Sequence, residues 1–259
     1  MSAPARRPSL AGLLEDRAVV VTAAAGTGIG YATARRCAQA GARLLISDLH
    51  ERRLHEAAAR LAEETGRRPA VALCDVTQQA QVDALVATAL SELGAIDVLV
   101  NNAGLGGYAK LVDMTDEQWA KVLDVTLTGT MRTTRAVLPH MLARRRGAIV
   151  NNASVLGWRA QEGQSHYAAA KAGVMAFTRC VAMEAAPAGV RVNAVAPSLA
   201  MHEFLSKVTP PGLLEELEAR EAFRRAATPE EVADVIVFLA SDLASYMTGE
   251  VVSVSSQHP

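Results

Sequence analysis

The sequence predicts an α/β protein with a single doubly wound domain, in which helices cover both faces of a seven-stranded parallel sheet. Short runs rich in Val, Ile and Leu alternate with longer Ala-rich amphipathic segments. Each strand and helix pair takes about 30 residues, as a right-handed crossover requires. No Pro/Ser/Gly-rich linker divides the 259 residues, and their 50% hydrophobic content is enough for one large core.

The expected strands are short because buried parallel strands appear as continuous apolar runs between turn signals. The first run leads into a glycine-rich turn, and the last lies near the end of the chain. In order, the strands are expected at 18–21, 43–47, 70–74, 98–100, 148–151, 191–195 and 251–254.

The segments between the strands have the 3.6-residue apolar period of helices that lie on a sheet. The segment before the last strand breaks this rhythm and predicts a looser helix at 212–225. The regular helices are expected at 28–40, 52–65, 78–93, 117–145, 167–186 and 229–240.

Two segments are expected to lie outside the regular fold. Residues 1–15 predict an N-terminal arm rather than a signal peptide, because no apolar run follows Arg6 and Arg7. The domain then spans 16–259. Within it, 197–228 interrupts the strand and helix alternation at the carboxyl end of a strand, which predicts a substrate lid.

Composition excludes several classes of function. With 26 Lys plus Arg against 27 Asp plus Glu, the net charge of -1 offers no basic excess for nucleic acid. Three cysteines without a C-x-x-C pair and six histidines without HExxH predict no disulfide framework and no metal site. The uncharged run 18–34 carries too many Gly and Thr residues for a membrane span. We therefore expect a cytoplasmic protein without a membrane or nucleic-acid partner.

The glycine-rich turn predicts a phosphate site. It reads VTAAAGTGIGYATARR, with Gly26, Gly28 and Gly30 opening a helix whose unpaired N–H groups and dipole favour an anion. The G-x-G-x-x-G fingerprint is not met because Tyr31 follows Gly30. On this turn alone, an ordinary helix start remains an alternative.

Asp48 supports a Rossmann-type dinucleotide site. It follows Gly28 by 20 residues, at the end of the second strand, where a carboxylate accepts both hydroxyls of an adenosine ribose. A carboxylate there also repels a 2′-phosphate, which favours NAD(H) over NADP(H). His50, Arg52 and Arg53 lie just downstream. Because these cations suit a phosphate, NADP(H) is not excluded.

Candidate catalytic groups lie in the segment between residues 154 and 171. Ser154 precedes Tyr167 by thirteen residues, and Lys171 follows it by four, which places Tyr and Lys on one face of a helix. A Tyr hydroxyl has a pKa of about 10 in water, so proton exchange near neutrality requires a stabilised phenolate. A neighbouring Lys ammonium provides that stabilisation.

In combination, the motifs of this chain resemble the short-chain dehydrogenase/reductase family. The glycine turn, Asp48 and the Ser, Tyr and Lys set occur in order with CDVT at 74–77, NNAG at 101–104 and N-x-V-x-P at 193–197. The resemblance covers the chain apart from roughly the first 15 residues. It implies hydride transfer between a nicotinamide ring and a carbinol carbon of a small-molecule substrate.

The resemblance also implies a role for each matched residue. Tyr167 would be the general acid/base, Ser154 the donor that polarises the reacting oxygen, and Lys171 the ribose-binding residue that lowers the pKa of the tyrosine. Thr126 would join this catalytic set, while Asn101 would line the adenosine side of the cofactor. The cofactor-binding set implied by the family is Thr22, Gly26, Gly28, Ile29, Gly30, Asp48, Asp75, Val76, Asn102, Ala103, Gly104, Tyr167, Lys171 and Pro197.

Three positions depart from the family pattern. Aligned on Gly28 and Gly30, the family's T-G-x-x-x-G-x-G turn has Ala23 and Ala24 at its Thr and Gly, whereas alignment on Thr22 needs one extra residue. Thr126, in VTLTG, replaces the Asn that kinks a helix and holds a relay water. Finally, the segment after Pro197 begins with Ser198 and places His202 where a Thr often contacts the nicotinamide amide.

The pattern is most similar to actinobacterial family members of steroid C/D-ring catabolism, which predicts a hydroxy-indanone propionate or its CoA thioester as substrate. His166, Trp158 and Arg159 are candidates for substrate contacts as well as for packing or exposure. The resemblance further implies a homodimer or homotetramer. The alternatives are a 3-hydroxyacyl-thioester or hydroxysteroid dehydrogenase, a dehydratase or epimerase, and a non-catalytic NAD-binding regulator.

Overall fold

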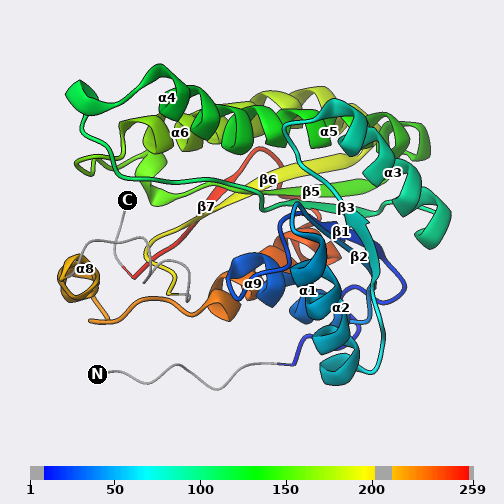
Figure 1. Cartoon of the computed structure of the whole chain (residues 1–259). Coiled ribbons are helices and arrows are strands. Elements are labelled where there is room, and N and C mark those ends of the chain that lie inside the picture. Colours follow the sequence, from blue (N-terminus) through cyan, green and yellow to red (C-terminus); the bar gives the residue numbers. More distant parts are fainter. Residues whose placement is uncertain (1–8, 202–211, 257–259) are drawn as a thin grey trace.

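The computed structural model describes residues 9–201 and 212–256, and its centre is a parallel sheet of seven strands (Figure 1). The strand order is β3-β2-β1-β4-β5-β6-β7, and every neighbouring pair is parallel. The strands are β1 (Ala18–Val21), β2 (Arg43–Asp48), β3 (Ala70–Leu73), β4 (Val98–Asn101), β5 (Gly147–Asn152), β6 (Val190–Pro197) and β7 (Val251–Val254).

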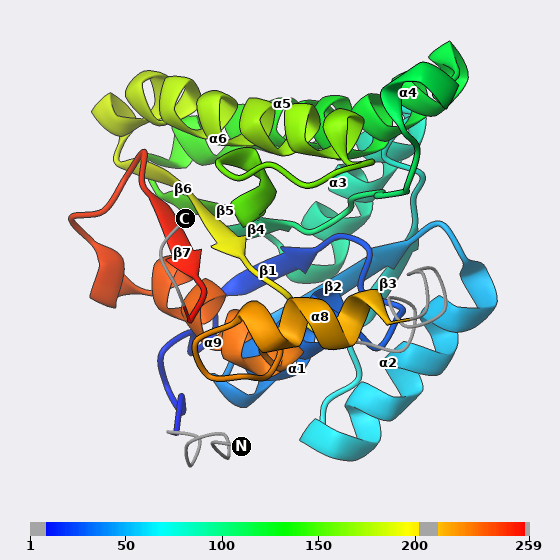
Figure 2. The same cartoon turned by 90° about the vertical axis from the view of Figure 1, so that its left-hand side faces the viewer.

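Helices cover both faces of the sheet, as Figures 1 and 2 show from two sides. One face carries α1 (Ile29–Gln39), α2 (Glu51–Thr65) and α9 (Pro229–Ala240). The other carries α3 (Gln79–Leu93), α4 (Asp116–Leu123), α5 (Gly129–Arg144) and α6 (Ser165–Ala185). A further helix, α8 (Leu213–Arg220), lies in the segment between β6 and α9.

Local sequence explains where several helices begin and end. Thr228 accepts a hydrogen bond from the Glu231 N–H at the start of α9, while the Glu231 side chain accepts one from the Thr228 N–H, a reciprocal cap. Helices α2 and α3 end at Gly66 and Gly94, which have positive φ angles that glycine adopts without strain. These local signals set the ends of α2 and α3 and the start of α9.

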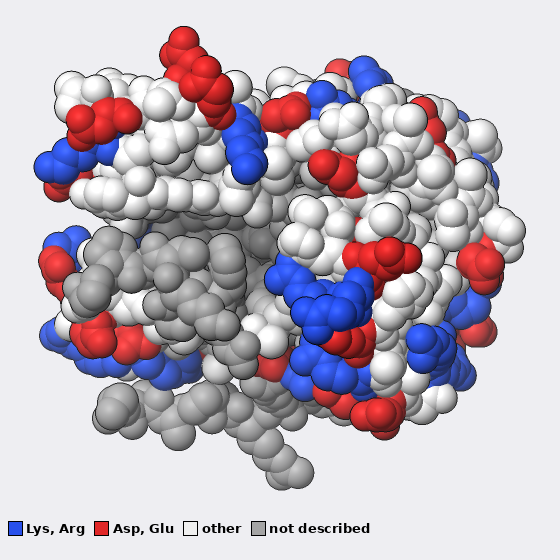
Figure 3. Space-filling view, viewed as in Figure 1, with Lys and Arg blue, Asp and Glu red and all other residues white. Residues whose placement is uncertain are grey.

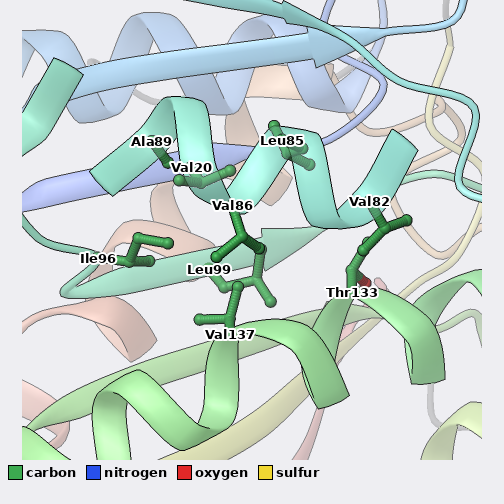
Figure 4. A pocket seen from close by; sticks show the side chains of 9 residues that line it. All are labelled: Val20, Val82, Leu85, Val86, Ala89, Ile96, Leu99, Thr133 and Val137. Atoms are coloured by element: carbon green, nitrogen blue, oxygen red, sulfur yellow. The ribbon is translucent and has the colours of Figure 1, made fainter. Parts of the chain in front are cut away.

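Among the described residues, the core consists of two large apolar clusters, one on each face of the sheet, and a smaller third cluster that includes residues of α6 and β6. The inner strands β1 and β4 are buried on both sides, which explains their uninterrupted apolar sequence. Figure 4 shows an apolar gap between α3, α5, β1 and β4 that has no room for a water molecule. It belongs to the packing of the core. Its lining consists of Val20, Val82, Leu85, Val86, Ala89, Ile96, Leu99, Thr133 and Val137.

The expected fold class is confirmed, and the strands lie within about two residues of their predicted positions. The helix expected at 117–145 matches a helical span at 116–144, but five residues inside it, Asp124–Thr128, form a π-helical turn between α4 and α5 that was not predicted. The looser helix expected at 212–225 ends at Arg220, since Glu221 is extended and Arg224 has a φ of 55°. Residues 202–211 of the expected lid lie outside the described residues.

The described end of the expected arm contacts the domain. Leu14 is 1% exposed and packs into the cluster beneath α1, α2 and α9, and its N–H donates to the carbonyl of Ala40. Among the described residues, no helix is long and apolar enough to cross a membrane.

The topology places the candidate site. Successive crossovers run outward in opposite directions from the neighbouring strands β1 and β4. In a doubly wound sheet the ligand crevice lies at the carboxyl ends of the strands, at this switch point. The glycine turn follows β1, Asn102 follows β4, and Ser154 follows β5, so all three lie at this edge.

Candidate active site

The glycine turn leaves donors for an anion and approaches the turn after β4 closely. No side chain caps the first turn of α1 after Gly28, so the first N–H groups of this helix face outward without a side-chain acceptor. Gly30 is needed for space, because a Cβ there would lie 2.4 Å from both the Ala23 carbonyl oxygen and Asn102 Nδ2. This part of the site suits a pyrophosphate.

Thr22 follows β1 and holds the start of the turn after β4. Its Oγ1 accepts hydrogen bonds from the N–H groups of Asn102 at 3.0 Å and Ala103 at 3.1 Å. The next residue, Ala23, has a φ of 52°, the left-handed conformation that glycine adopts more readily. These contacts favour the alignment on Thr22, in which the turn contains one residue more than the family pattern.

Asp48 lies at the last position of β2, beside the glycine turn. Its two carboxylate oxygens accept hydrogen bonds from the N–H groups of Ala25 at 3.2 Å and His50 at 3.0 Å. Burial raises the pKa of this carboxyl, whereas the backbone donors and Arg53 act in the opposite direction. An open hollow lies next to it, lined by residues 49–53. Figure 3 shows blue Lys and Arg side chains over α1 and α2 in this region.

Asp75 and Val76, both expected in the cofactor-binding set, lie after β3. Asp75 Oδ1 accepts hydrogen bonds from the N–H of Thr77 at 2.9 Å and from its hydroxyl at 2.8 Å. Val76 is buried against Gly129, where a Cβ would lie 2.6 Å from Val76 Cγ2. These contacts fix the loop, so Asp75 keeps its second oxygen available.

Ser154 and Tyr167 come together at the carboxyl end of β5. Tyr167 lies in the first turn of α6 and is hydrogen-bonded to the Ser154 side chain. Ser154 Oγ also accepts a hydrogen bond from the N–H of Leu156 at 3.2 Å, which orients the hydroxyl. Burial raises the pKa of Tyr167 to about 12, and the Ser154 hydrogen bond opposes this shift.

Lys171 lies one helical turn after Tyr167, but its ammonium does not contact the tyrosine hydroxyl. Lys171 Nζ donates to the backbone carbonyl of Asn152 and lies 5.5 Å from the centre of the Tyr167 ring. It would be 3.4 Å from a Cβ on Gly104. Burial lowers the pKa of Lys171 to about 7. In this structure burial, rather than mutual stabilisation, dominates the pKa values of both groups.

Thr126 is buried in the π-helical turn and holds the loop that follows β4. Its Oγ1 accepts a hydrogen bond from the N–H of Leu105 at 3.0 Å and donates to the Leu105 carbonyl at 3.2 Å. The hydroxyl proton of Thr126 is therefore already donated to the Leu105 carbonyl. This geometry indicates a positioning role rather than direct proton transfer.

Two loops meet beside the catalytic side chains. The N–H of Ala109 donates to the carbonyl of Gly163 at 3.0 Å, and an exposed ion pair joins Lys110 to Glu162. His166 is buried, and its Nε2 would lie 3.5 Å from a Cβ on Gly107 in the first of these loops. Burial lowers the pKa of His166, which favours a neutral imidazole. Figure 3 shows a hollow on this face of the molecule, beneath the ridge that includes α4.

The other predicted substrate contacts differ in exposure. Trp158 is 43% exposed, whereas Arg159 donates to Ser255 Oγ at 3.4 Å. Pro197 ends β6, and the N–H of Ser198 donates to the carbonyl of Val254 at 3.1 Å. His202 lies outside the described residues. Among the described residues, no group of three or more His, Cys, Asp or Glu side chains is arranged to hold a metal ion.

Sequence reasoning missed Asn152, whose side chain contacts the NNAG turn. Successive residues of a strand point to opposite faces. Asn151 is buried towards α6 and donates to Thr178 Oγ1, whereas Asn152 donates to Asn102 Oδ1 at 2.9 Å. The signal was the doubled asparagine at the end of β5, a polar residue on each face of the strand.

The geometry and the matching sequence place this chain in the short-chain dehydrogenase/reductase family. A family model described as enoyl-(acyl carrier protein) reductase matches residues 23–256. The chain is therefore an oxidoreductase of this family, whose members use NAD(H) or NADP(H). Its reaction class is the nicotinamide-dependent interconversion of an alcohol and a ketone.

Individual relatives cover nearly the whole chain. It is 61% identical over 249 residues to the (5R,7aS)-5-hydroxy-7a-methyl-1-oxo-2,3,5,6,7,7a-hexahydro-1H-indene-carboxyl-CoA reductase of Mycobacterium tuberculosis, covering 96% of this chain and 95% of the relative. A cis-4-hydroxycyclohexanecarboxylate dehydrogenase of Sinomonas cyclohexanicum is 42% identical over 240 residues, covering 92% and 95%. The crystal structure of a short chain dehydrogenase from Mycobacterium smegmatis has 55% identity and a TM-score of 0.88, covering 100% and 99%.

Proposed function

We propose that this protein is an NAD(H)-dependent dehydrogenase/reductase that interconverts a ring secondary alcohol and its ketone on a bicyclic hydroxy-indanone. The substrate would carry an acidic side chain, as a propionate or its CoA thioester. One observation carries the proposal: Ser154 and Tyr167 are hydrogen-bonded to each other, and Lys171 lies beside them. They lie at the carboxyl edge of the sheet, where α1 also begins without a side-chain cap. The relative named for an indene-carboxyl-CoA supports the choice of substrate.

The residues at this edge fit a nicotinamide dinucleotide. The free N–H groups at the start of α1 suit the pyrophosphate, and Asp48 suits the adenosine ribose. Asp75, Ala103 and Gly104 would hold the adenosine part of the dinucleotide, and Pro197 would flank the nicotinamide. When bound, the dinucleotide accepts or supplies the hydride.

The side chains of the protein move and hold the proton of the substrate oxygen. In alcohol oxidation, the Tyr167 oxygen takes the hydroxyl proton as hydride leaves the carbinol carbon, and in ketone reduction it returns the proton. The Ser154 hydroxyl holds the same substrate oxygen, and the Leu156 N–H orients it from the other side. Lys171 supplies positive charge that favours the Tyr167 phenolate.

Thr126 contributes indirectly to this chemistry. By binding both backbone groups of Leu105, it fixes the loop that leads from Asn102, Ala103 and Gly104. We assign it a positioning role in place of the Asn that the family pattern has there.

The choice of NAD(H) over NADP(H) rests on Asp48. A carboxylate held by two backbone N–H groups accepts ribose hydroxyls and repels a 2′-phosphate. Arg52 and Arg53 lie beside it. The preference between NAD(H) and NADP(H) is therefore set by competition between the fixed carboxylate of Asp48 and the more exposed guanidinium groups of these arginines.

The proposal includes a homodimer or homotetramer in the cytoplasm. Large apolar side chains are exposed on the helical layer next to the site, including Met183 of α6 at 78% and Trp119 of α4 at 37%. Such side chains favour burial against another copy of the chain.

The experiment that tests the function measures NADH formation by the wild type and by Tyr167→Phe. The panel contains hydroxy-indanone propionates, their CoA thioesters, 3-hydroxyacyl thioesters and hydroxysteroids. We expect the wild type to oxidise the indanone substrates and Tyr167→Phe to lose this turnover while it still binds NADH. A wild type that binds NADH but converts nothing would support a regulator instead. Product without net NADH would indicate a dehydratase or epimerase.

A further inference from the structure

Asn152 joins the catalytic strand to the dinucleotide turn. Its Nδ2 donates to Asn102 Oδ1 at 2.9 Å. Asn102 Nδ2 in turn donates to two successive carbonyls of the turn after β1, those of Thr22 at 3.2 Å and Ala23 at 3.0 Å. The side chain of Asn152 thus orients the amide that holds this turn in place.

The turn needs such support because its backbone is strained. Ala23 has a φ of 52°, a left-handed conformation in which a Cβ crowds the following carbonyl oxygen. The same turn leaves no space at Gly30, where a Cβ would clash with the Ala23 carbonyl and with Asn102 Nδ2. A small rotation of Asn102 would therefore move the start of α1, which offers its N–H groups to a phosphate.

Asn152 also contacts the catalytic helix and keeps an open acceptor. Its backbone carbonyl accepts a hydrogen bond from Lys171 Nζ. Its side-chain Oδ1 is buried and has no hydrogen-bond partner within the described part of the chain. Buried acceptors are usually paired, so this oxygen suits a donor that arrives with a ligand, such as a ribose hydroxyl.

We propose that Asn152 is a positioning residue of the dinucleotide site, which holds Asn102 against the strained turn and offers Oδ1 to a hydroxyl of the bound dinucleotide. This inference rests on the dinucleotide-binding half of the proposed function and is independent of the substrate. It assigns to Asn152 an effect on cofactor affinity rather than on the chemical step.

The test compares NADH binding by the wild type and Asn152→Leu, which keeps a similar volume without hydrogen-bonding groups. Binding is followed by protein fluorescence well below the melting temperature. We expect the dissociation constant to rise about tenfold, as the loss of one or two hydrogen bonds predicts. At saturating NADH, kcat for ketone reduction should change by less than about twofold, because Ser154, Tyr167 and Lys171 remain.

Two further variants separate positioning from general stability. Asn193 is buried on the neighbouring strand β6 and is bonded to the backbone of Met247 and Glu250, away from the turn. Asn193→Leu should lower the melting temperature and leave NADH affinity unchanged. Ala23→Gly relieves the strain that Asn102 holds, so in the Asn152→Leu background it should recover part of the lost affinity.

The outcomes are distinct. Unchanged NADH affinity in Asn152→Leu, or an equal loss in Asn193→Leu, would overturn this inference while leaving the proposed function intact. No recovery by Ala23→Gly would overturn the link through the strained turn. A wild type that bound neither NADH nor NADPH would overturn both the inference and the proposed function.

Discussion

At the scale of residues, burial dominates the pKa values of two side chains to which we assign catalytic roles. Burial raises the pKa of Tyr167 to about 12 and lowers that of Lys171 to about 7. The tyrosine is thus kept protonated and the lysine easily loses its charge. With a pKa of about 7, part of Lys171 is charged near neutrality, and this charge favours the Tyr167 phenolate.

The pKa of Lys171 gives a prediction for stability. Between pH 7 and 10.5 the unfolded chain binds a proton at this lysine and the folded protein does not, so stability rises with pH through this window. The cost of burying the lysine is greatest below pH 7. Lys171→Met should therefore raise the melting temperature most at pH 6–7 and progressively less towards pH 9.5. A gain that is the same at every pH would contradict the assignment.

The left-handed backbone at Ala23 gives a second prediction. Ala23→Gly removes the steric cost of the positive φ, partly offset by the greater entropy of glycine in the unfolded chain. We expect stabilisation by up to about 1 kcal/mol in urea unfolding. Ala24→Gly is the matched control, because Ala24 is buried and has no positive φ. It should destabilise the protein, and equal effects of the two changes would count against the strain.

Asp48 gives a third prediction at this scale. Asp48→Ala removes the carboxylate that accepts ribose hydroxyls and repels a 2′-phosphate, while Arg53 remains. The ratio of kcat/KM for NAD to that for NADP should fall sharply, on the order of tenfold or more. Arg53→Ala serves as the control and should move the ratio in the opposite direction. An unchanged ratio of kcat/KM for NAD to that for NADP in Asp48→Ala would contradict the role assigned to Asp48.

At the scale of elements, a π-helical turn lies between α4 and α5, inside the helical span that the sequence predicted. The turn buries Thr126 and presents its hydroxyl to Leu105, in the loop after β4. The hydrophobic period of a sequence locates helices well, but it does not reveal the extra residue that a π-helical turn contains. The family motif VTLTG marked the position, and the structure supplied the contact.

A fourth prediction concerns Thr126, in the π-helical turn. Thr126→Val keeps the shape and removes both hydrogen bonds to Leu105, so turnover should fall about tenfold with little change in NAD affinity. Thr126→Ser keeps the hydroxyl and should retain most of the turnover. The two variants are compared by steady-state kinetics. Equal activity in Thr126→Val and the wild type would show that this loop is positioned by other contacts.

At the scale of the whole molecule, the doubly wound parallel sheet and both helical layers were predictable, because apolar runs and helical periods are properties of the local sequence. The order of the strands in the sheet comes from the structure. The positions of Ser154, Tyr167 and Lys171 were likewise marked by their spacing and by the family motifs. The direction in which Lys171 points and the contact between Asn152 and Asn102 were not, since both depend on residues brought together by the fold.

The expected dinucleotide site, at the carboxyl edge of the sheet, depends on single residues, on elements and on the order of the strands. Thr22 after β1, Asn102 after β4 and Asn152 at the end of β5 form one chain of hydrogen bonds across the carboxyl edge of the sheet. The catalytic helix joins it through Lys171. The sheet thus fixes the distance between the expected cofactor turn and the groups that handle the proton.

The most direct measurement of the central claim follows a deuterium atom. A hydroxy-indanone propionate, or its CoA thioester, labelled with deuterium at the carbinol carbon is incubated with the enzyme and NAD. The account predicts that the label appears in NADH in the wild type and that Tyr167→Phe forms little labelled NADH. Product formed by the wild type with the label retained in the substrate or lost to water would contradict hydride transfer to the nicotinamide ring.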